Sequence, residues 1–556
     1  MSKVRLFGHS LLWVFTVSLI LLAVFIATAR FILEDIPAYK NDLEVYLSEE
    51  MAGDVQISGL SARMEGFKPQ LSLKKVRLDE LNHQTNTLSI GEIRLSFNPL
   101  NFFSGDLKPS QITLVDSAIK IKRLDDGRFS IIGLSSDQES GDSSGDFSWL
   151  LEGRRFEIID SQIIWQDDLR DLPDVTLDQA QVVFQNNGQE HTLKVIANMP
   201  KETGGSFVLA IEVIGDVLST ADWNAKAYFK AKKIKLDKYL SRLNLDKLSI
   251  QQGEGDIELW SHWEAAALSQ VKGNLAVKEA RLQQEAETLN VSNFSGQFAW
   301  NKLLNGWSLY AKNLAFKTEM TEQEQSQFNV RYSAEQKEGY SISAAVDGIN
   351  LEAMSHLLQY SKVLDQSFLS VLKETKVSGL LNKASFSVHQ GENSVAWAAC
   401  GELEKVSTLA YGLLPKMSHF SGTGCSTQDK GWLNLAVKEG SIYFQGLFRD
   451  PILVDSLDGQ LTWAQDETGW LIKTDFIRLN SPHVKTQSRM MLHLPTTADN
   501  ASIDLQTNFS QADSRFTSQY LPVGIMDKEV VHWLDKAFIA GDIKEGGGLL
   551  FKGPLS

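Results

Sequence analysis

The sequence has few cysteines, few prolines and no excess of positive charge. Its 556 residues include 12 prolines and only two cysteines, which excludes a disulfide-rich scaffold and a metal domain built on cysteine clusters. The 54 lysines and arginines are outnumbered by 69 aspartates and glutamates, so the net charge is −15. Because binding to a nucleic-acid backbone depends on cations that displace counterions, nucleic acid is a poor candidate for a partner. The 43% of hydrophobic residues is typical of a folded chain.

Motifs that carry catalytic chemistry are also lacking. The chain has no G-x-S-x-G turn, no H-E-x-x-H helix and no P-loop. Gly422-Thr423-Gly424-Cys425 has two glycines of a dinucleotide-binding fingerprint, but it lacks the third glycine and the strand–helix–strand context. The ten histidines are scattered singly, and isolated histidines are more often surface residues than metal ligands. We therefore expect no enzymatic activity, no cofactor and no metal site.

The N-terminus contains an uncharged apolar run at residues 11–29, preceded by Lys3 and Arg5. The run predicts a transmembrane anchor over 11–33, a cytoplasmic tail over 1–10, and export of everything that follows. The alternative is a cleaved signal peptide, since Ala27-Thr28-Ala29 fits an A-x-A cleavage site. The length of the apolar run and its continuation past Arg30 favour the anchor.

Residues 34–53 predict a short amphipathic helix, because apolar residues recur at helical spacing and Pro37 stands where a first turn accepts it. Such a helix would pack its apolar stripe on the first strands. It could also lie near the membrane surface and cap the start of a sheet, and the two roles are compatible.

From residue 54 to residue 556 apolar and polar residues alternate with period two, separated by turns rich in Gly, Asn and Asp. The pattern predicts a mainly β fold, a long antiparallel meander with few helices. The helices are expected near 351–361 and 527–540, the second with Asp527 as its N-cap, and a mobile loop is expected at 135–146. The alternation slips at Lys74-Lys75 and at Gly91-Glu92, which predicts β-bulges there.

Residues 117–132 (SAIKIKRLDDGRFSII) predict a β-hairpin that turns at 125–127. Ile119 and Ile121 would share one face, with Lys120 and Lys122 on the other.

Weak internal repeats accompany the strands. Residues 115–119 (VDSAI) resemble residues 159–163 (IDSQI), 44 residues later. An apolar-Ser/Asp-Gly motif opens strands at 294–296, 377–379, 420–422 and 457–459. Spacings near 40 residues suggest stacked β units rather than separate domains, although each match alone fits a generic turn before a strand.

A meander of this length exceeds one barrel or one sandwich, so we expect a sheet curled into an elongated hydrophobic groove. An open apolar face implies a ligand, and phospholipid acyl chains are its natural occupant. The residues expected to line the groove are Leu71, Leu73, Leu95, Phe97, Ile119, Ile121, Phe129 and Ile131.

If the chain is exported to an oxidising compartment, Cys400 and Cys425 could form a disulfide. Two unpaired buried cysteines are an equally acceptable outcome.

The segments PQLSLKKVRLDEL (69–81), IGEIRLSFNPLNFFSGDL (90–107) and KIKRLDDGRFSIIGL (120–134) resemble the AsmA-like family of bacterial envelope proteins. The segment YLPVGIMDKEVVHWLDKAFIAGDIKEGGGLLFKGPL (520–555) is more specific and resembles the YhdP branch of that family.

This resemblance implies a protein anchored in the inner membrane, with its bulk in the periplasm. It also implies a groove that carries phospholipids towards the outer membrane, as in the bridge-like lipid-transfer proteins of chorein type. Members of the branch are longer, so the chain is expected to be an N-terminal portion. The alternative is a non-enzymatic scaffold or assembly factor that binds other envelope proteins.

Overall fold

The computed structural model describes residues 2–50, 53–80, 87–104, 108–125, 129–131, 155–169, 172–216, 222–240, 248–284, 287–335, 339–359, 366–392, 394–412, 414–496, 500–544 and 546–554. The loop predicted at 135–146 lies outside these residues. The chain divides into two compact units: unit 1 comprises residues 1–243 and 253–269, and unit 2 comprises residues 244–252 and 270–556.

The first helix, α1 (Ser2–Glu34), contains the whole of the predicted anchor at 11–33. Apolar side chains on α1 such as Trp13 and Phe31 are exposed, at 69% and 74%. Among the described residues, however, no helix has both the length and the apolar character needed to cross a membrane. The helix is therefore present, but its transmembrane role is not confirmed.

The segment predicted as one amphipathic helix at 34–53 is divided into η1 (Ile36–Tyr39) and α2 (Lys40–Glu50). Ile36, Leu43 and Leu47 pack against the buried apolar cluster of unit 1. Two side chains of α2 also accept hydrogen bonds from the backbone of the first strand: Glu44 Oε1 from Ile57 N (2.6 Å) and Ser48 Oγ from Val55 N (3.0 Å). These bonds satisfy N–H groups at a sheet edge.

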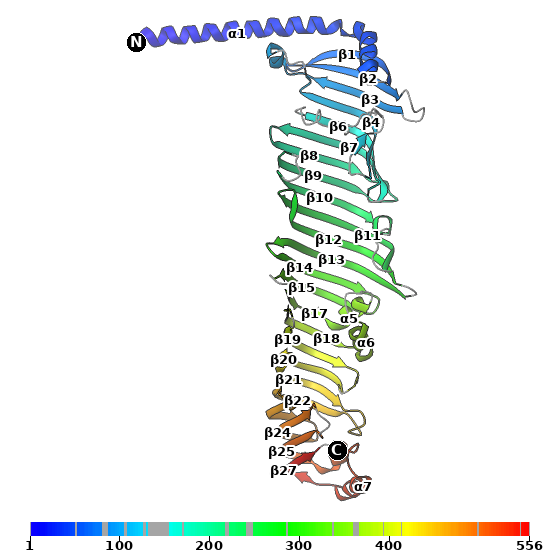
Figure 1. The fold of residues 1–556 in the computed structure, drawn as a ribbon, viewed down its shortest axis with the longest axis vertical. Coiled ribbons are helices and arrows are strands. Elements are labelled where there is room, and N and C mark those ends of the chain that lie inside the picture. Colours follow the sequence, from blue (N-terminus) through cyan, green and yellow to red (C-terminus); the bar gives the residue numbers. More distant parts are fainter. Residues whose placement is uncertain are drawn as a thin grey trace. The chain divides into compact units, whose positions relative to one another are not determined.

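Unit 1 is mainly a sheet, and except for its short fifth strand its strands follow one another in chain order (Figure 1). It also contains η2 (Pro99–Ser104) and α4 (Leu236–Leu240). Its strands are β1 (Gly53–Glu65), β2 (Lys68–Glu80), β3 (Thr87–Ser96), β4 (Gln111–Arg123), β5 (Phe129–Ile131), β6 (Arg155–Asp167), β7 (Leu172–Asn187), β8 (Glu190–Asn198), β9 (Ser206–Gly215), β10 (Trp223–Lys235) and most of β11 (Leu248–Glu264).

The hairpin predicted at 117–132 is confirmed, because β5 pairs antiparallel with residues 121–123 of β4. The expectation that every neighbouring pair is antiparallel is wrong at one place: β4 and β6 are parallel, with Ile112 opposite Phe156 and Arg123 opposite Asp167. The reason lies in which edge of β4 the hairpin uses. Since β6 covers one edge of β4 over 112–123, β3 and β5 must share the other edge, and the hairpin leaves the first edge free for β6.

Unit 2 is a second, antiparallel series of strands with helices at two places. The helices predicted near 351–361 and 527–540 are present as α5 (Leu351–Gln359) and α7 (Lys528–Ala537), and Asp527 caps α7 by accepting a hydrogen bond from Glu529 N. The other helices are α6 (Gln366–Thr375), which the sequence analysis missed, and η3 (Ser514–Tyr520).

The strands of unit 2 are β12 (Ala267–Gln284), β13 (Glu287–Leu303), β14 (Gly306–Thr318), β15 (Glu322–Ala334), β16 (Tyr340–Asp347), β17 (Ile349–Asn350), β18 (Ser378–Gln390), β19 (Val395–Thr408), β20 (Lys416–Thr427), β21 (Lys430–Tyr443), β22 (Ile452–Gln465), β23 (Gly469–Asn480), β24 (Val484–Pro495), β25 (Ser502–Asp513), β26 (Asp542–Ile543) and β27 (Gly547–Pro554).

Many strands contain one exposed polar residue in the left-handed conformation, with φ between 44° and 55°. Such a residue interrupts the alternation, so the buried residues on its two sides are three positions apart instead of two, as Leu73 and Val76 are around Lys75. We call these the crease residues: Lys75, Asp116, Asp160, Gln179 and Lys233 in unit 1, and Asn293, Asn313, Lys383, Lys405, His419 and Glu439 in unit 2.

The slips predicted at Lys74-Lys75 and Gly91-Glu92 are real, but they are not bulges. Lys74 pairs with Glu92 and Val76 with Ile90, so the ladder between β2 and β3 skips one residue on each strand. A bulge would place an extra residue on one strand only. Because β2 and β3 slip in the same row, the register between these two strands is preserved.

Candidate lipid-binding surface

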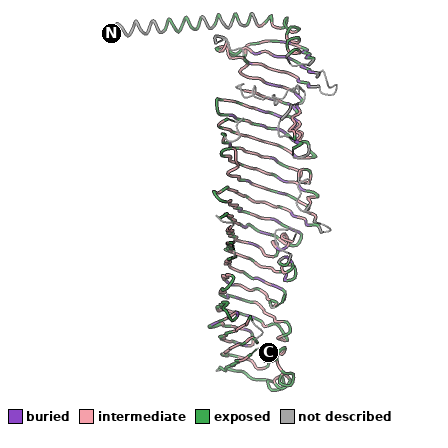
Figure 2. Tube along the Cα trace, viewed as in Figure 1, coloured by how far each residue is buried: buried purple, intermediate pink, exposed green. Residues whose placement is uncertain are grey.

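The apolar face of unit 1 forms a buried cluster that extends from β1 to β10. Leu73 and Ile119 belong to it and are only 3% and 5% exposed. Buried positions recur along these strands (Figure 2). Apolar side chains of successive strands therefore bury one another in unit 1, and Leu73 and Ile119 leave almost no surface for a ligand.

The other residues of unit 1 that were predicted to line a groove are less buried than Leu73 and Ile119. Leu71, Leu95 and Ile121 are half-buried and pack against the same cluster. Phe97, also half-buried, follows the end of β3, and its backbone N–H donates to the carbonyl of residue 69 (3.0 Å). The backbones of Phe129 and Ile131 lie in β5, opposite Arg123 and Ile121, while their side chains are outside the described part of the structure. Contact of these residues with a ligand remains a prediction.

Charged groups of unit 1 pair with one another next to this region. Arg94 donates a hydrogen bond to Glu92 (2.7 Å), and the hydroxyl of Ser72 donates to the other carboxylate oxygen (2.5 Å). The bond from Arg94 is the main reason that the pKa of Glu92 is lowered below its usual value. This carboxylate is therefore held ionised and paired at neutral pH.

Unit 2 contains an open apolar cavity of about 410 Å³ formed over β16 and β18 to β22. None of its lining side chains is charged. The lining consists of Ala344, Val346, Leu381, Ala384, Ser385, Phe386, Ala399, Cys400, Gly401, Leu403, Gly424, Cys425, Ser426, Trp432, Leu433 and Trp463.

The cavity exists because neighbouring strands carry small residues at facing positions. Gly401 of β19 lies opposite Gly424 of β20, and Ala399 lies opposite Ser426. Larger side chains surround these positions, and among them Phe386 is 44% exposed. A surface of this kind can accept an uncharged aliphatic chain, because no ionic group has to be desolvated.

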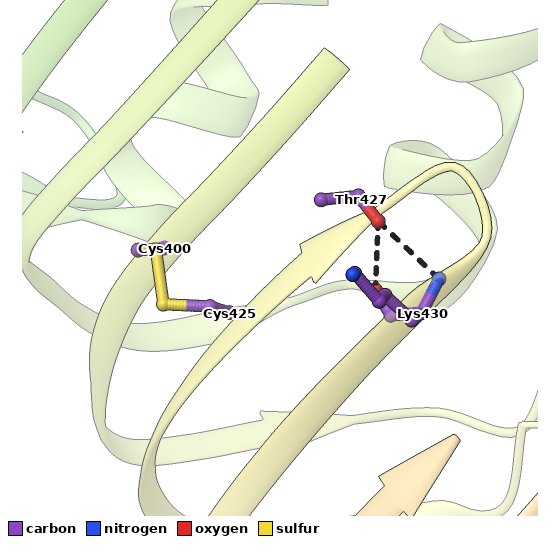
Figure 3. Close-up of a disulfide and its surroundings, with 4 residues drawn as sticks. All are labelled: Cys400, Cys425, Thr427 and Lys430. Carbon is purple, nitrogen blue, oxygen red and sulfur yellow. Dashed lines mark hydrogen bonds between the residues drawn. A yellow bond between two sulfur atoms is a disulfide. The ribbon is translucent and has the colours of Figure 1, made fainter. Parts of the chain in front are cut away.

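The two cysteines are part of the cavity wall. Cys400 and Cys425 are directly opposite each other on β19 and β20 and form a disulfide with an S–S distance of 2.15 Å (Figure 3). Of the two states that the sequence left open, the structure has the bonded one. Nearby, the hydroxyl of Thr427 accepts from Lys430 N (3.3 Å) and donates to its carbonyl (3.1 Å), which closes the turn from β20 to β21 (Figure 3).

The sequence pattern does not predict this cavity, although Gly422 and Gly424 are part of its signal. Both glycines lie in the middle of strand β20, not in the nucleotide-binding turn that they partly resemble. Glycine inside a strand often marks a place where another group approaches closely. No group of residues suited to a metal ion is found in the described part of the chain.

Comparisons with known proteins relate the chain to one family. A family model described as "YhdP protein" matches residues 1–556. The curated "Intermembrane phospholipid transporter YhdP" of Escherichia coli (strain K12) is 18% identical over 548 residues, which cover 94% of this chain and 41% of that protein. This chain thus spans about two fifths of the length of that relative. No solved structure matches the chain. Because the family model covers its whole length, the chain belongs to the YhdP family.

Proposed function

We propose that this chain takes part in phospholipid transport between the inner and outer membranes, and that it binds the lipid by its acyl chains without any chemical step. The observation that carries the proposal is the uncharged cavity of unit 2, with partly exposed apolar side chains such as Phe386 on its wall. The transport function in the name of the E. coli relative supports the same substrate.

The energetics fit a carrier that holds lipid loosely. Burial of an acyl chain contributes about 0.8 kcal/mol per methylene. An open surface buries only part of each chain, and movement between similar apolar positions changes the buried area little. The predicted residues of unit 1 would add to such a path where their side chains are half-buried, as at Leu71, Leu95 and Ile121.

We also propose a location in the inner membrane, with residues 11–33 as a single-pass anchor, residues 1–10 in the cytoplasm and the bulk of the chain in the periplasm. Lys3 and Arg5 precede the apolar run of α1, as the positive-inside rule requires for this orientation. The disulfide supports an oxidising compartment for unit 2. If mass measurement of the mature protein shows that it starts at Arg30, the anchor is a cleaved signal peptide instead.

The test is a photo-crosslinking amino acid placed at Phe386 in cells. We expect adducts whose added mass equals that of phospholipid, because residue 386 is exposed on the cavity wall. The matched control is the same crosslinker at Lys405, an exposed crease residue of the neighbouring strand β19. Equal lipid capture at both positions, or none at Phe386, would contradict the proposal.

A scaffold that binds other envelope proteins is the second candidate, and α7 together with the residues just after it favours this role. Trp533 and Ile539 are 65% and 77% exposed. The helix is held by Arg449, which forms two hydrogen bonds with the carboxylate of Asp535 (2.8 and 2.7 Å). Crosslinks from Trp533 to protein, together with an absence of lipid adducts at Phe386, would support this candidate over transport.

A further inference from the structure

Where β19 and β20 meet at the cavity floor of unit 2, one facing pair lacks the side chains that normally fix strand register. Gly401 and Gly424 face each other, and on the other edge of β20 Gly422 and Gly424 face Leu435 and Leu433. Cross-strand contacts between side chains are the main stabilisation of a sheet, and glycine supplies none. Register is therefore weakly specified in glycine-rich strands.

The disulfide lies directly beside this weak point. Cys400 and Cys425 form the pair next to Gly401 and Gly424, so the covalent link joins β19 and β20 where side-chain contacts are missing. A shift of one residue would turn Cys425 to the opposite face of the sheet, because side chains alternate along a strand. The bond is compatible with one register only.

Register in turn determines the shape of the cavity. The space is present because small residues of β18, β19 and β20 coincide at Ala384, Gly401 and Gly424. A one-residue shift of β20 would bring the side chain of Thr423 or Cys425 to the place of Gly424. A Cβ atom at that place lies 2.8 Å from the carbonyl oxygen of Trp432 and 3.2 Å from Cδ1 of Leu433, so the wall of the cavity would have to rearrange.

We propose that the Cys400–Cys425 disulfide is a register lock that keeps the cavity of unit 2 open, so that the cavity depends on the oxidation state of the two thiols. Opening the lock takes two electrons and two protons from a dithiol: the S–S bond breaks, two S–H groups form, and the dithiol becomes a disulfide. Only the lipid arm of the test below rests on the proposed transport function.

The direct test is hydrogen exchange of the full chain, oxidised and after treatment with dithiothreitol. We expect backbone amides of β19 and β20 to exchange at least about tenfold faster after reduction, because the glycine-rich pair opens more often. Strands β23 and β24 of the same unit, which contain no cysteine, are the internal control. Equal exchange in both states would overturn the proposal.

The double variant Cys400→Ser/Cys425→Ser separates the loss of the bond from other effects of the reductant. It should exchange like the reduced wild-type chain and should not respond to dithiothreitol. If it exchanges like the oxidised wild-type chain, the bond does not hold the register. Should this variant fail to fold, the reduced wild-type chain still provides the comparison.

The lipid arm uses vesicles of phosphatidylglycerol that carry a diazirine on one acyl chain. We expect labelling of peptides that contain residues 384, 401 and 424 to fall several-fold on reduction, with labelling elsewhere unchanged. Unchanged labelling of these peptides would overturn the link between lock and cavity. If no lipid labels the protein in either state, the transport proposal fails, whereas the exchange measurement still decides on the lock.

Discussion

Two glycines beside the cavity are covered by side chains of the protein itself. A Cβ atom at Gly401 would lie 3.2 Å from Cδ1 of Leu381 and 3.3 Å from the Cβ of Ala384, closer than ordinary van der Waals contact. At Gly431 a Cβ would lie 2.4 Å from the indole of Trp463, which already covers that glycine. Leu381 and Trp463 can pack closely on these strands because residues 401 and 431 have no side chain.

At the scale of single residues, we predict that Leu433→Asp abolishes lipid capture. Leu433 lines the cavity, and a carboxylate there must either remain hydrated in the path of an acyl chain or be desolvated at high cost. We expect crosslinked lipid at Phe386 to fall by about tenfold or more, with a folded sheet by circular dichroism. Asn434→Asp, at the exposed neighbouring position, is the matched control and should retain capture. Equal losses in the two variants would show that added charge alone is responsible.

At the scale of the strand, the crease explains the sequence repeats. Residues 115–119 and 159–163 are parallel partners in β4 and β6, with Asp116 and Asp160 both in the left-handed conformation. Ser117 follows the crease residue Asp116, and its backbone N–H donates a hydrogen bond to Ser161 Oγ of the other strand (3.0 Å). The repeat thus marks equivalent positions of adjacent strands.

A similar interaction occurs in unit 2, where a side chain of a neighbouring strand accepts a hydrogen bond from the backbone N–H of the crease residue. Lys405 N donates to Ser421 Oγ (2.9 Å), and Lys383 N donates to Asp347 Oδ1 (2.8 Å). Ser421 is the serine of the apolar-Ser/Asp-Gly motif at 420–422. For this copy of the motif, the polar residue has a structural role that a generic turn would not require.

We predict that Ser421→Ala destabilises unit 2 by about 1 kcal/mol, because the N–H of Lys405 loses its acceptor. Urea unfolding followed by tryptophan fluorescence measures the change. Ser502→Ala, at an exposed position of β25, should change the free energy of unfolding by less than about 0.5 kcal/mol. A Ser421→Ala variant as stable as this control would refute the capping role.

At the scale of the whole molecule, the two units use their apolar faces differently. In unit 1 most of the apolar face lies in a buried cluster, and α2 packs on part of this cluster. In unit 2 the second buried cluster is smaller and involves α5 through Ala353, while β16 and β18 to β22 line an open cavity. The same period-two pattern therefore produces a core in one unit and an accessible surface in the other.

The substitution Ile119→Asp tests whether the apolar face of unit 1 is a buried core or an accessible surface. Because Ile119 is 5% exposed and lies in the buried cluster, we expect a loss of several kcal/mol of stability in unit 1. Hydrogen exchange by peptide should show the loss in β3, β4 and β6 and not in β22 to β24. If the variant is stable but no longer captures lipid, Ile119 lines an open groove, as the sequence alone suggested.

The sequence by itself determined the local structure. Period-two alternation is a property of the strand backbone, so it predicted the β fold, the hairpin at 117–132 and the slips at Lys75 and Gly91. The N-cap of α7 at Asp527 was equally local. The motifs at 520–555 indicated the family, which the match over the whole chain then confirmed.

Only the tertiary structure decided whether the apolar face of each strand is buried by the protein or left accessible. Alternation shows that one face of a strand is apolar, but it carries no information on whether that face is buried by the protein or left open, as at Ile119 and Phe386. The parallel pairing of β4 with β6 and the bond between Cys400 and Cys425 join residues far apart in the sequence. The cavity depends on small residues of several strands that lie next to one another. The pairing register that brings them together is not specified by any single strand.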